Sequence, residues 1–139
     1  MKNNFTNRYF GLRTRSCSNG NYKIFEYNKP YTMTLTNFAF LNVKMLEAFY
    51  KPEYSELVDW VAANRNGEDI LMSYIIKREF KTAPIVMKLD ALHLGYFDGI
   101  SSGSDHLEKR NKCCRKYNEF FRENLGDMYE MNSFLQKTW

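Results

Sequence analysis

The tetrapeptide Asn66-Gly67-Glu68-Asp69 places an amide and two carboxylates just ahead of a segment with helical spacing. The first-turn N–H groups of a helix lack intrahelical partners and make that end electropositive. A carboxylate there stays ionised, so Asp69 is a candidate to orient sugar hydroxyls or to stabilise positive charge developing on a substrate. The same pattern also predicts a structural role, with Asn66 as N-cap and Asp69 completing a cap-like arrangement. The two roles are compatible.

A second candidate cluster is the run Lys109–Lys116, which carries five cationic side chains. A solvated helix face accounts for most runs of this kind. Within it we expect Arg110 to turn inward and bind a phosphate through two parallel hydrogen bonds, a geometry that a lysine cannot match.

Other chemistries lack their motifs. His93, His106, Cys113 and Cys114 do not have the paired spacing of zinc ligands, so no metal ligand is assigned. The sequence contains no GxxxxGK[ST] or GxGxxG motif. A net charge of +4 is weak for a nucleic-acid binder, and we expect Trp60 to belong to the core rather than to a base-stacking surface.

The elements that must position these residues fit into one α/β unit. The chain has 139 residues, of which 44% are hydrophobic and 17% aromatic, enough for a single core. Residues 1–21 are polar and are predicted to be irregular, with a turn at Ser18–Asn21. Two neighbouring strands are expected first, at 22–27 and 31–36, and three helices follow, from 41 to before 52, from 54 to before 66 and from 70 to before 83. A buried strand is then expected at 84–89 and a Gly/Ser-rich loop at about 95–103. The last elements are a long helix at 107–125 and a strand at 128–134.

Four segments resemble, in order and spacing, the C-terminal half of the exostosin and exostosin-like glycosyltransferases of family 64. They are Tyr31–Leu41, Leu57–Met72, Lys81–Ile85 and Ser104–Phe121, and a fainter similarity lies at Phe10–Arg15. Each motif is weak alone, and their shared order carries the resemblance.

The resemblance implies a partial GT-A fold, in which a mixed sheet is flanked by helices, with residues 22–139 forming the C-terminal part of the domain. It implies a retaining transferase that uses a UDP-sugar donor and a glycan acceptor, as in heparan sulfate synthesis, on the lumenal side of the Golgi or endoplasmic reticulum membrane. By this resemblance Asp69 and Arg110 are catalytic, and Asn66 and Glu68 bind the donor. The carboxylate would lie beside the donor sugar and the guanidinium would face the diphosphate.

The chain also departs from the family pattern. Gly67 stands where the family has a cysteine that pairs with the cysteine at position 113, so Cys113 is expected to be free or to pair with Cys17. Phe38 replaces a small residue near the expected acceptor. The family binds Mn²⁺ through an Asp-x-Asp motif, and no Asp-x-Asp occurs in this sequence. We therefore expect weak activity or none from the chain alone.

An alternative function is a non-catalytic module on the same fold that binds an anionic polysaccharide. Its ligands would be the cations of the basic run, which are Lys109, Arg110, Lys112, Arg115 and Lys116. Nucleic acid is not an expected partner, and the sequence has no apolar run long enough to span a membrane.

Overall fold

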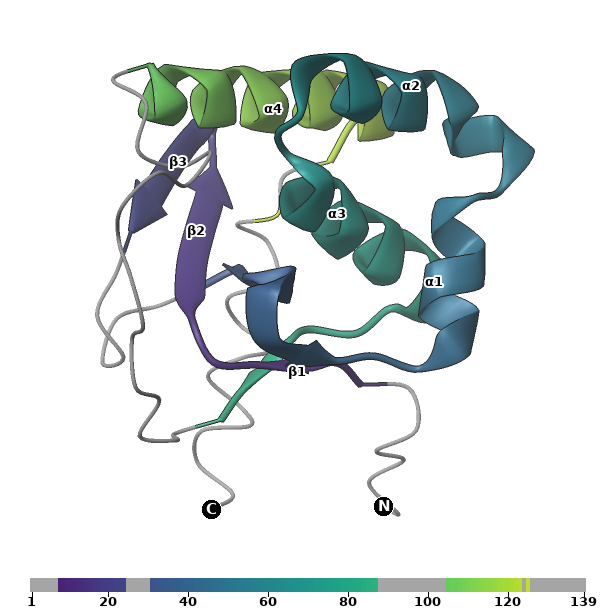
Figure 1. The fold of residues 1–139 in the computed structure, drawn as a ribbon. Helices are drawn as coiled ribbons and strands as arrows, with labels where there is room; N and C mark the ends of the chain where they lie inside the picture. Colours follow the sequence, from purple (N-terminus) through teal and green to yellow (C-terminus); the bar gives the residue numbers. More distant parts are fainter. Residues whose placement is uncertain (1–7, 25–30, 88–104, 124, 126–139) are drawn as a thin grey trace.

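The computed structural model describes residues 8–24, 31–87, 105–123 and 125. These residues form a mixed α/β fold, in which two small sheets pack with a group of helices (Figure 1). The predicted fold class is confirmed, and the arrangement is compatible with part of a nucleotide-sugar transferase fold. Among the described segments, no helix combines the length and apolar character needed to cross a bilayer.

The strands make two sheets of three strands each within the described residues. In one sheet β1 lies in the middle, antiparallel to β5 and parallel to β6. In the other, β2 lies between β3 and β4 and is antiparallel to both. Asn19 and Gly20, both with positive φ, turn the chain from β2 into β3, as the Asn-Gly pair predicts. The strands are β1 Phe10–Gly11, β2 Thr14–Ser18, β3 Asn21–Ile24, β4 Met33–Thr34, β5 Ala39–Phe40 and β6 Ile85–Val86.

Two predictions about the strands are wrong. Residues 10–11 and 14–18 are not irregular but form β1 and β2, which are too short and too polar to show strand periodicity. The predicted strands 22–27 and 31–36 are not neighbours either, because β2 lies between β3 and β4. The hydrogen-bond partner that separates them comes from the segment that looked least structured.

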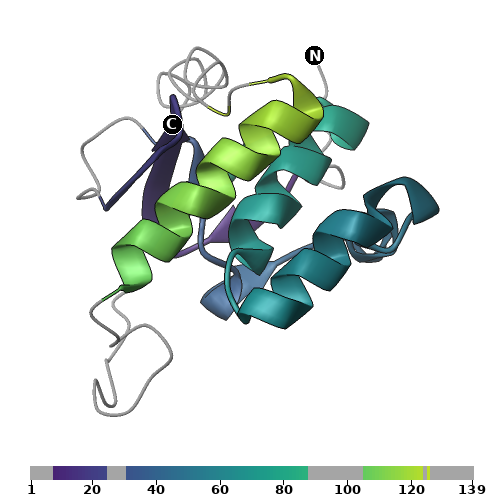
Figure 2. The ribbon, with the colours of Figure 1, turned by 90° about the horizontal axis from the view of Figure 1, so that it is seen from above.

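Four α-helices and two short 3₁₀ helices make up the rest of the described fold. Helix α3 is the central one: Asp69–Ile76 is buried, and α1, α2 and α4 all contact it. Seen from above, α2, α3 and α4 lie side by side (Figure 2). The helices are η2 Thr36–Phe38, α1 Val43–Phe49, η3 Pro52–Tyr54, α2 Ser55–Asn64, α3 Glu68–Phe80 and α4 His106–Phe121.

The helical predictions hold in part. Pro52 opens η3 as expected, and α3 ends at Phe80, before Pro84. Helix α4 ends four residues early, where Arg122 adopts the left-handed conformation (φ 51°). The apolar residues of this segment predict Leu107 on the inner face of the helix, but Leu107 is exposed, whereas Arg110 is buried. The Gly/Ser-rich loop and the strand predicted at 128–134 lie outside the described residues.

An aromatic cluster fills the space between α3 and α4. The rings of Tyr74 and Phe121 stack with centroids 5.3 Å apart, and Tyr117 meets Tyr74 edge to face. Trp60 packs against this cluster and contacts Tyr117 edge to face, as predicted. These contacts fix the face of α4 that is turned toward the start of α3.

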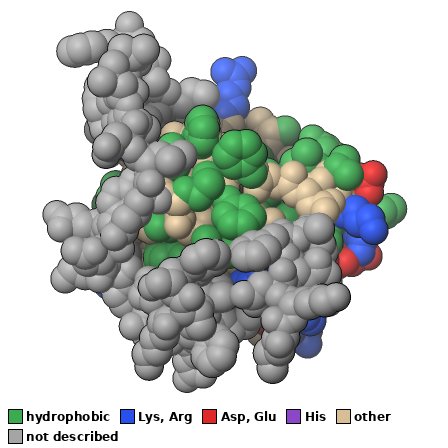
Figure 3. All heavy atoms as spheres, turned by 90° about the horizontal axis from the view of Figure 1, so that it is seen from below, with side chains coloured by type: hydrophobic (Ala, Val, Ile, Leu, Met, Phe, Trp, Pro, Cys, Tyr) green, Lys and Arg blue, Asp and Glu red, His purple; other side chains and the backbone are tan. Residues whose placement is uncertain are grey.

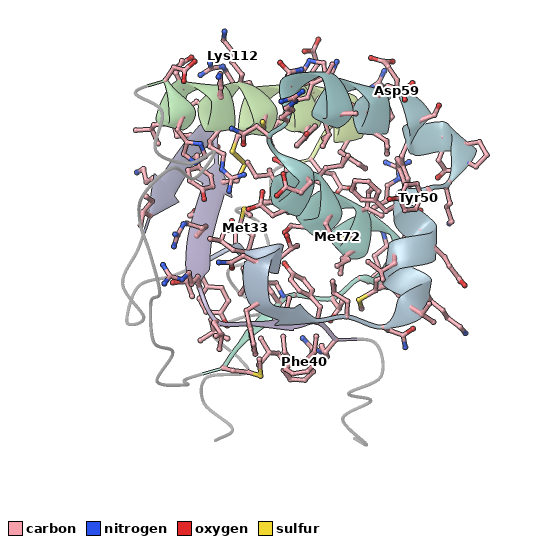
Figure 4. The ribbon with its side chains drawn as sticks, viewed as in Figure 1. Met33, Phe40, Tyr50, Asp59, Met72 and Lys112 are labelled. Carbon is pink, nitrogen blue, oxygen red and sulfur yellow. A yellow bond between two sulfur atoms is a disulfide. The ribbon has the colours of Figure 1, made fainter. Side chains whose placement is uncertain are left out.

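The opposite side of the molecule keeps apolar side chains in solvent. Phe40 points away from the core (Figure 4), and its ring meets that of Phe38 edge to face. Both are about half exposed, at 60% and 49%. Hydrophobic side chains also gather on the face seen from below (Figure 3).

Candidate functional site

The start of α3 does not have the predicted cap. Gly67 is the N-cap residue, with a φ of 89°, and no side chain caps this end of the helix. The prediction that Asn66 is the N-cap is therefore wrong, since a left-handed Gly67 separates it from the helix. The Asp69 carboxylate instead accepts a hydrogen bond from the backbone N–H of Ile70, at 2.8 Å. The first turn thus holds the carboxylate without using Asn66.

Asp69 and Arg110 meet in a buried two-point ion pair. The Arg110 Nη1 donates to Asp69 Oδ1 at 2.6 Å, and Nη2 donates to Oδ2 at 2.5 Å. The two residues are only 3% and 5% exposed. The pair joins the first turn of α3 to the first turns of α4, across 41 positions of sequence. Arg110 is turned inward, as predicted, and in this structure both of its terminal nitrogens bind a carboxylate.

Three further side chains surround the guanidinium. Arg110 also donates to the amide oxygen of Asn66, at 3.2 Å, and to the hydroxyl of Tyr22, at 3.0 Å. The Asn66 amide nitrogen lies 3.4 Å from His106 Nδ1. Arg110 Nε is buried and has no hydrogen-bond partner among the described residues. The arrangement has one orphaned donor and otherwise pairs its polar groups with each other.

The charges of the pair shift the pKa values of their neighbours. Burial lowers the pKa of Arg110, but the Asp69 carboxylate and the Tyr22 hydroxyl outweigh it and leave that pKa raised. Burial, followed by the positive charge of Arg110, lowers the pKa of His106, so its ring is neutral at pH 7. Burial raises the pKa of Tyr22, which keeps its hydroxyl protonated. The ion pair is therefore bordered by neutral side chains at Tyr22 and His106.

Glu68, predicted to bind the donor, is exposed, and its side chain forms no hydrogen bond or ion pair with Arg110, whose charge nevertheless acts on it. Desolvation of its carboxyl group and the nearby Asp69 charge raise the pKa of Glu68. The structure thus brings together Asn66, Asp69 and Arg110 and leaves Glu68 beside them. Tyr22 was not predicted, because nothing in a short β-rich run shows that it will meet a helix 88 positions later.

For Cys113 the sequence predicts either a free thiol or a bond to Cys17, and the free thiol is confirmed. Cys17 of β2 is bonded to Cys114, and Cys113 is free and buried. Pairing between Cys17 and Cys113 is therefore wrong, because adjacent helical residues point about 100° apart and Cys113 faces Gly67 instead. Burial raises the pKa of the Cys113 thiol to about 11. The thiol is a packed core group at neutral pH.

Gly67→Ala is expected to destabilise the protein by about 2–4 kcal/mol, from left-handed backbone strain and overpacking together. A methyl group at this position would collide with Cys113 Sγ and lie 3.0 Å from Tyr117 Oη. Urea unfolding of the variant measures the loss. Gly67→Ala combined with Cys113→Ala is the control: it removes the collision with Sγ but keeps the backbone strain and the close approach to Tyr117 Oη, so it should recover only part of the loss. An unchanged midpoint in the single variant would contradict the close approach.

Comparison with known proteins identifies the family of this chain. The model of the glycosyl transferase family 64 domain matches residues 2–135, and the chain therefore belongs to that family. The chain is also similar to glycosylinositol phosphorylceramide mannosyl transferase 1 of Arabidopsis thaliana, with 32% identity over 91 residues. That match covers 66% of this chain and 27% of the relative, so the chain spans about a quarter of the relative's length.

Proposed function

We propose that this domain holds the donor sugar in a glycosyltransferase that uses a nucleotide-activated sugar, with UDP as the expected nucleotide and retention as the expected stereochemistry. The observation that carries the proposal is the buried two-point contact between Asp69 and Arg110 in a chain of family 64. The relative's name adds two candidates, mannose as the sugar and an inositol phosphorylceramide glycolipid as the acceptor.

The Asp69 carboxylate is suited to the sugar side of the reaction. Breaking the bond between a sugar and a diphosphate develops positive charge at the anomeric carbon, and a fixed carboxylate stabilises that charge. The Ile70 N–H and both terminal nitrogens of Arg110 hold the Asp69 carboxylate in one orientation. Because Asp69 is 3% exposed and both of its oxygens bind Arg110, the donor sugar would reach the carboxylate only when the side chains around it move aside.

Arg110 is suited to the phosphate side. Its orphaned Nε–H is a buried donor left over after the ion pair with Asp69 has formed. A phosphate oxygen is an acceptor of the kind that such a donor lacks. On this proposal Arg110 binds the leaving diphosphate through Nε while its terminal nitrogens hold Asp69.

The described residues do not fit the manganese ion that the family implies. The sequence has no Asp-x-Asp, and the described residues contain no group of three His, Cys, Asp or Glu side chains that could hold a metal. Both Asp69 oxygens are already bonded to Arg110.

The polysaccharide-binding alternative gains no support from the positions of its cations. Arg110 is buried, and Lys109, Arg115 and Lys116 pair with Asp105, Glu108 and Glu56. Of the five cations, Lys112 alone has no ion pair among the described residues, and it points outward from α4 (Figure 4). A single unpaired cation does not make a polyanion-binding surface.

Saturation-transfer NMR tests the proposal with the chain alone, because the method detects weak ligands. UDP-N-acetylglucosamine and a nucleotide-activated mannose are the probes. We expect saturation of sugar protons by the wild type and a loss of at least fivefold in Asp69→Glu, which keeps the charge and moves the carboxylate. Asp59→Asn, at an exposed carboxylate of α2, is the matched control. Absence of saturation with both donors, or equal signals in Asp69→Glu, would overturn the proposal.

A further inference from the structure

The Tyr22 side chain contacts Arg110 in two independent ways. Its hydroxyl accepts a hydrogen bond from Nη2 at 3.0 Å, and its ring lies under the guanidinium, with Arg110 Cζ 4.6 Å from the ring centroid. Asp69 meets the end of the guanidinium and Tyr22 meets its face. Together the two contacts define both the direction and the plane of the group.

The strand that carries Tyr22 is itself tied to α4. The Tyr22 backbone N–H donates to the side-chain oxygen of Asn111 at 2.8 Å. Cys17 is the cross-strand partner of Tyr22, and it is bonded to Cys114. Cys114 comes four residues after Arg110, so both lie on the same face of the helix, one turn apart. A cross-strand pair of the β2–β3 hairpin thus holds two successive turns of α4.

This arrangement limits how Arg110 can move. A guanidinium held only at its end by a carboxylate can still pivot about that contact, whereas a ring against its face blocks the pivot. Burial raises the pKa of Tyr22, so the hydroxyl stays neutral and compatible with the cation's N–H donors. The plane of the guanidinium, and with it the direction of Nε–H, is therefore set by a residue of β3.

We propose that Tyr22 is a positioning residue for Arg110, holding the guanidinium plane so that Nε–H keeps one direction in the site. An effect of Tyr22 on donor binding rests on the proposed function, whereas the restriction of Arg110 by Tyr22 does not. The Cys17–Cys114 bond supports it by fixing β2 against the next turn of α4.

The test uses ¹⁵N NMR of the arginine side chains, with the Arg110 signals assigned by their absence in Arg110→Lys. In the wild type we expect separate Nη signals, because the guanidinium does not rotate freely. Tyr22→Phe removes the hydroxyl and keeps the ring, and should speed guanidinium rotation at least threefold. Tyr22→Leu removes both contacts and should speed it at least tenfold.

Tyr31→Phe is the matched control, since the Tyr31 hydroxyl bonds to Pro84 and Val86. Unchanged Arg110 signals in both Tyr22 variants would overturn the proposal, whatever the donor assays give. Where the wild type binds a donor, Tyr22→Leu should weaken binding about tenfold, and equal binding would also overturn it. Failure of the proposed function shows separately, as absence of donor saturation in the wild type.

Discussion

Asp69→Asn is expected to lower the free energy of unfolding by about 3–5 kcal/mol, because it leaves a buried guanidinium without its counter-charge. Arg110 is 5% exposed, and its other partners, Asn66 and Tyr22, are neutral. Neutral acceptors do not offset the cost of taking a cation out of water. Urea unfolding followed by circular dichroism measures the change.

A double variant separates charge from packing. Asp69→Asn with Arg110→Met removes both charges, and we expect it to recover at least half of the lost stability, since a paired charge is often replaceable by an apolar side chain. Asp59→Asn, at an exposed carboxylate, should change stability by less than about 0.5 kcal/mol. Equal losses in the Asp69 and Asp59 variants would show that the ion pair does not form in solution.

Reduction of the Cys17–Cys114 bond is expected to lower the free energy of unfolding by about 4 kcal/mol. The bond joins residues 97 positions apart, so it removes a large amount of loop entropy from the unfolded chain. Unfolding with and without a phosphine reductant gives the difference. Cys17→Ala with Cys114→Ala is the control, and its stability should not respond to the reductant.

The pairing itself can be checked directly. Digestion under non-reducing conditions should give one peptide pair linked through Cys17 and Cys114, and thiol titration of the unfolded protein should find a single free thiol, at Cys113. Three free thiols, or a crosslink through Cys113, would contradict this arrangement.

The elements that could be predicted from the sequence are those with strong local signals. Helix α3 has an apolar pattern that Asn66-Gly67 precedes and Pro84 follows, and it forms where expected. The Asn19-Gly20 turn is also local. Strands β1 and β2 escaped prediction because a strand of two residues has no period, and the polar run of β2 is paired on both sides by distant segments.

The site divides in the same way. The resemblance assigned Asp69 and Arg110 to one site, and the structure brings them into contact. The N-cap role of Asn66 rests on local sequence alone, and it is wrong because the left-handed Gly67 takes the N-cap position. The contacts of Tyr22, and the choice of Cys114 over Cys113, depend on which face of α4 the hairpin meets. That face is decided by packing between segments distant in sequence.

The long reach of these contacts has a consequence for biosynthesis. The N-terminal part of a chain leaves the ribosome first, so Tyr22 and Asp69 are made 88 and 41 positions before their common partner. Until α4 emerges, the Asp69 carboxylate, the Cys17 thiol and the side of α3 that packs on α4 lack their native partners. A nascent chain at that stage exposes apolar surface and is a natural client for a chaperone. The ion pair and the disulfide can therefore form only after α4 has been made.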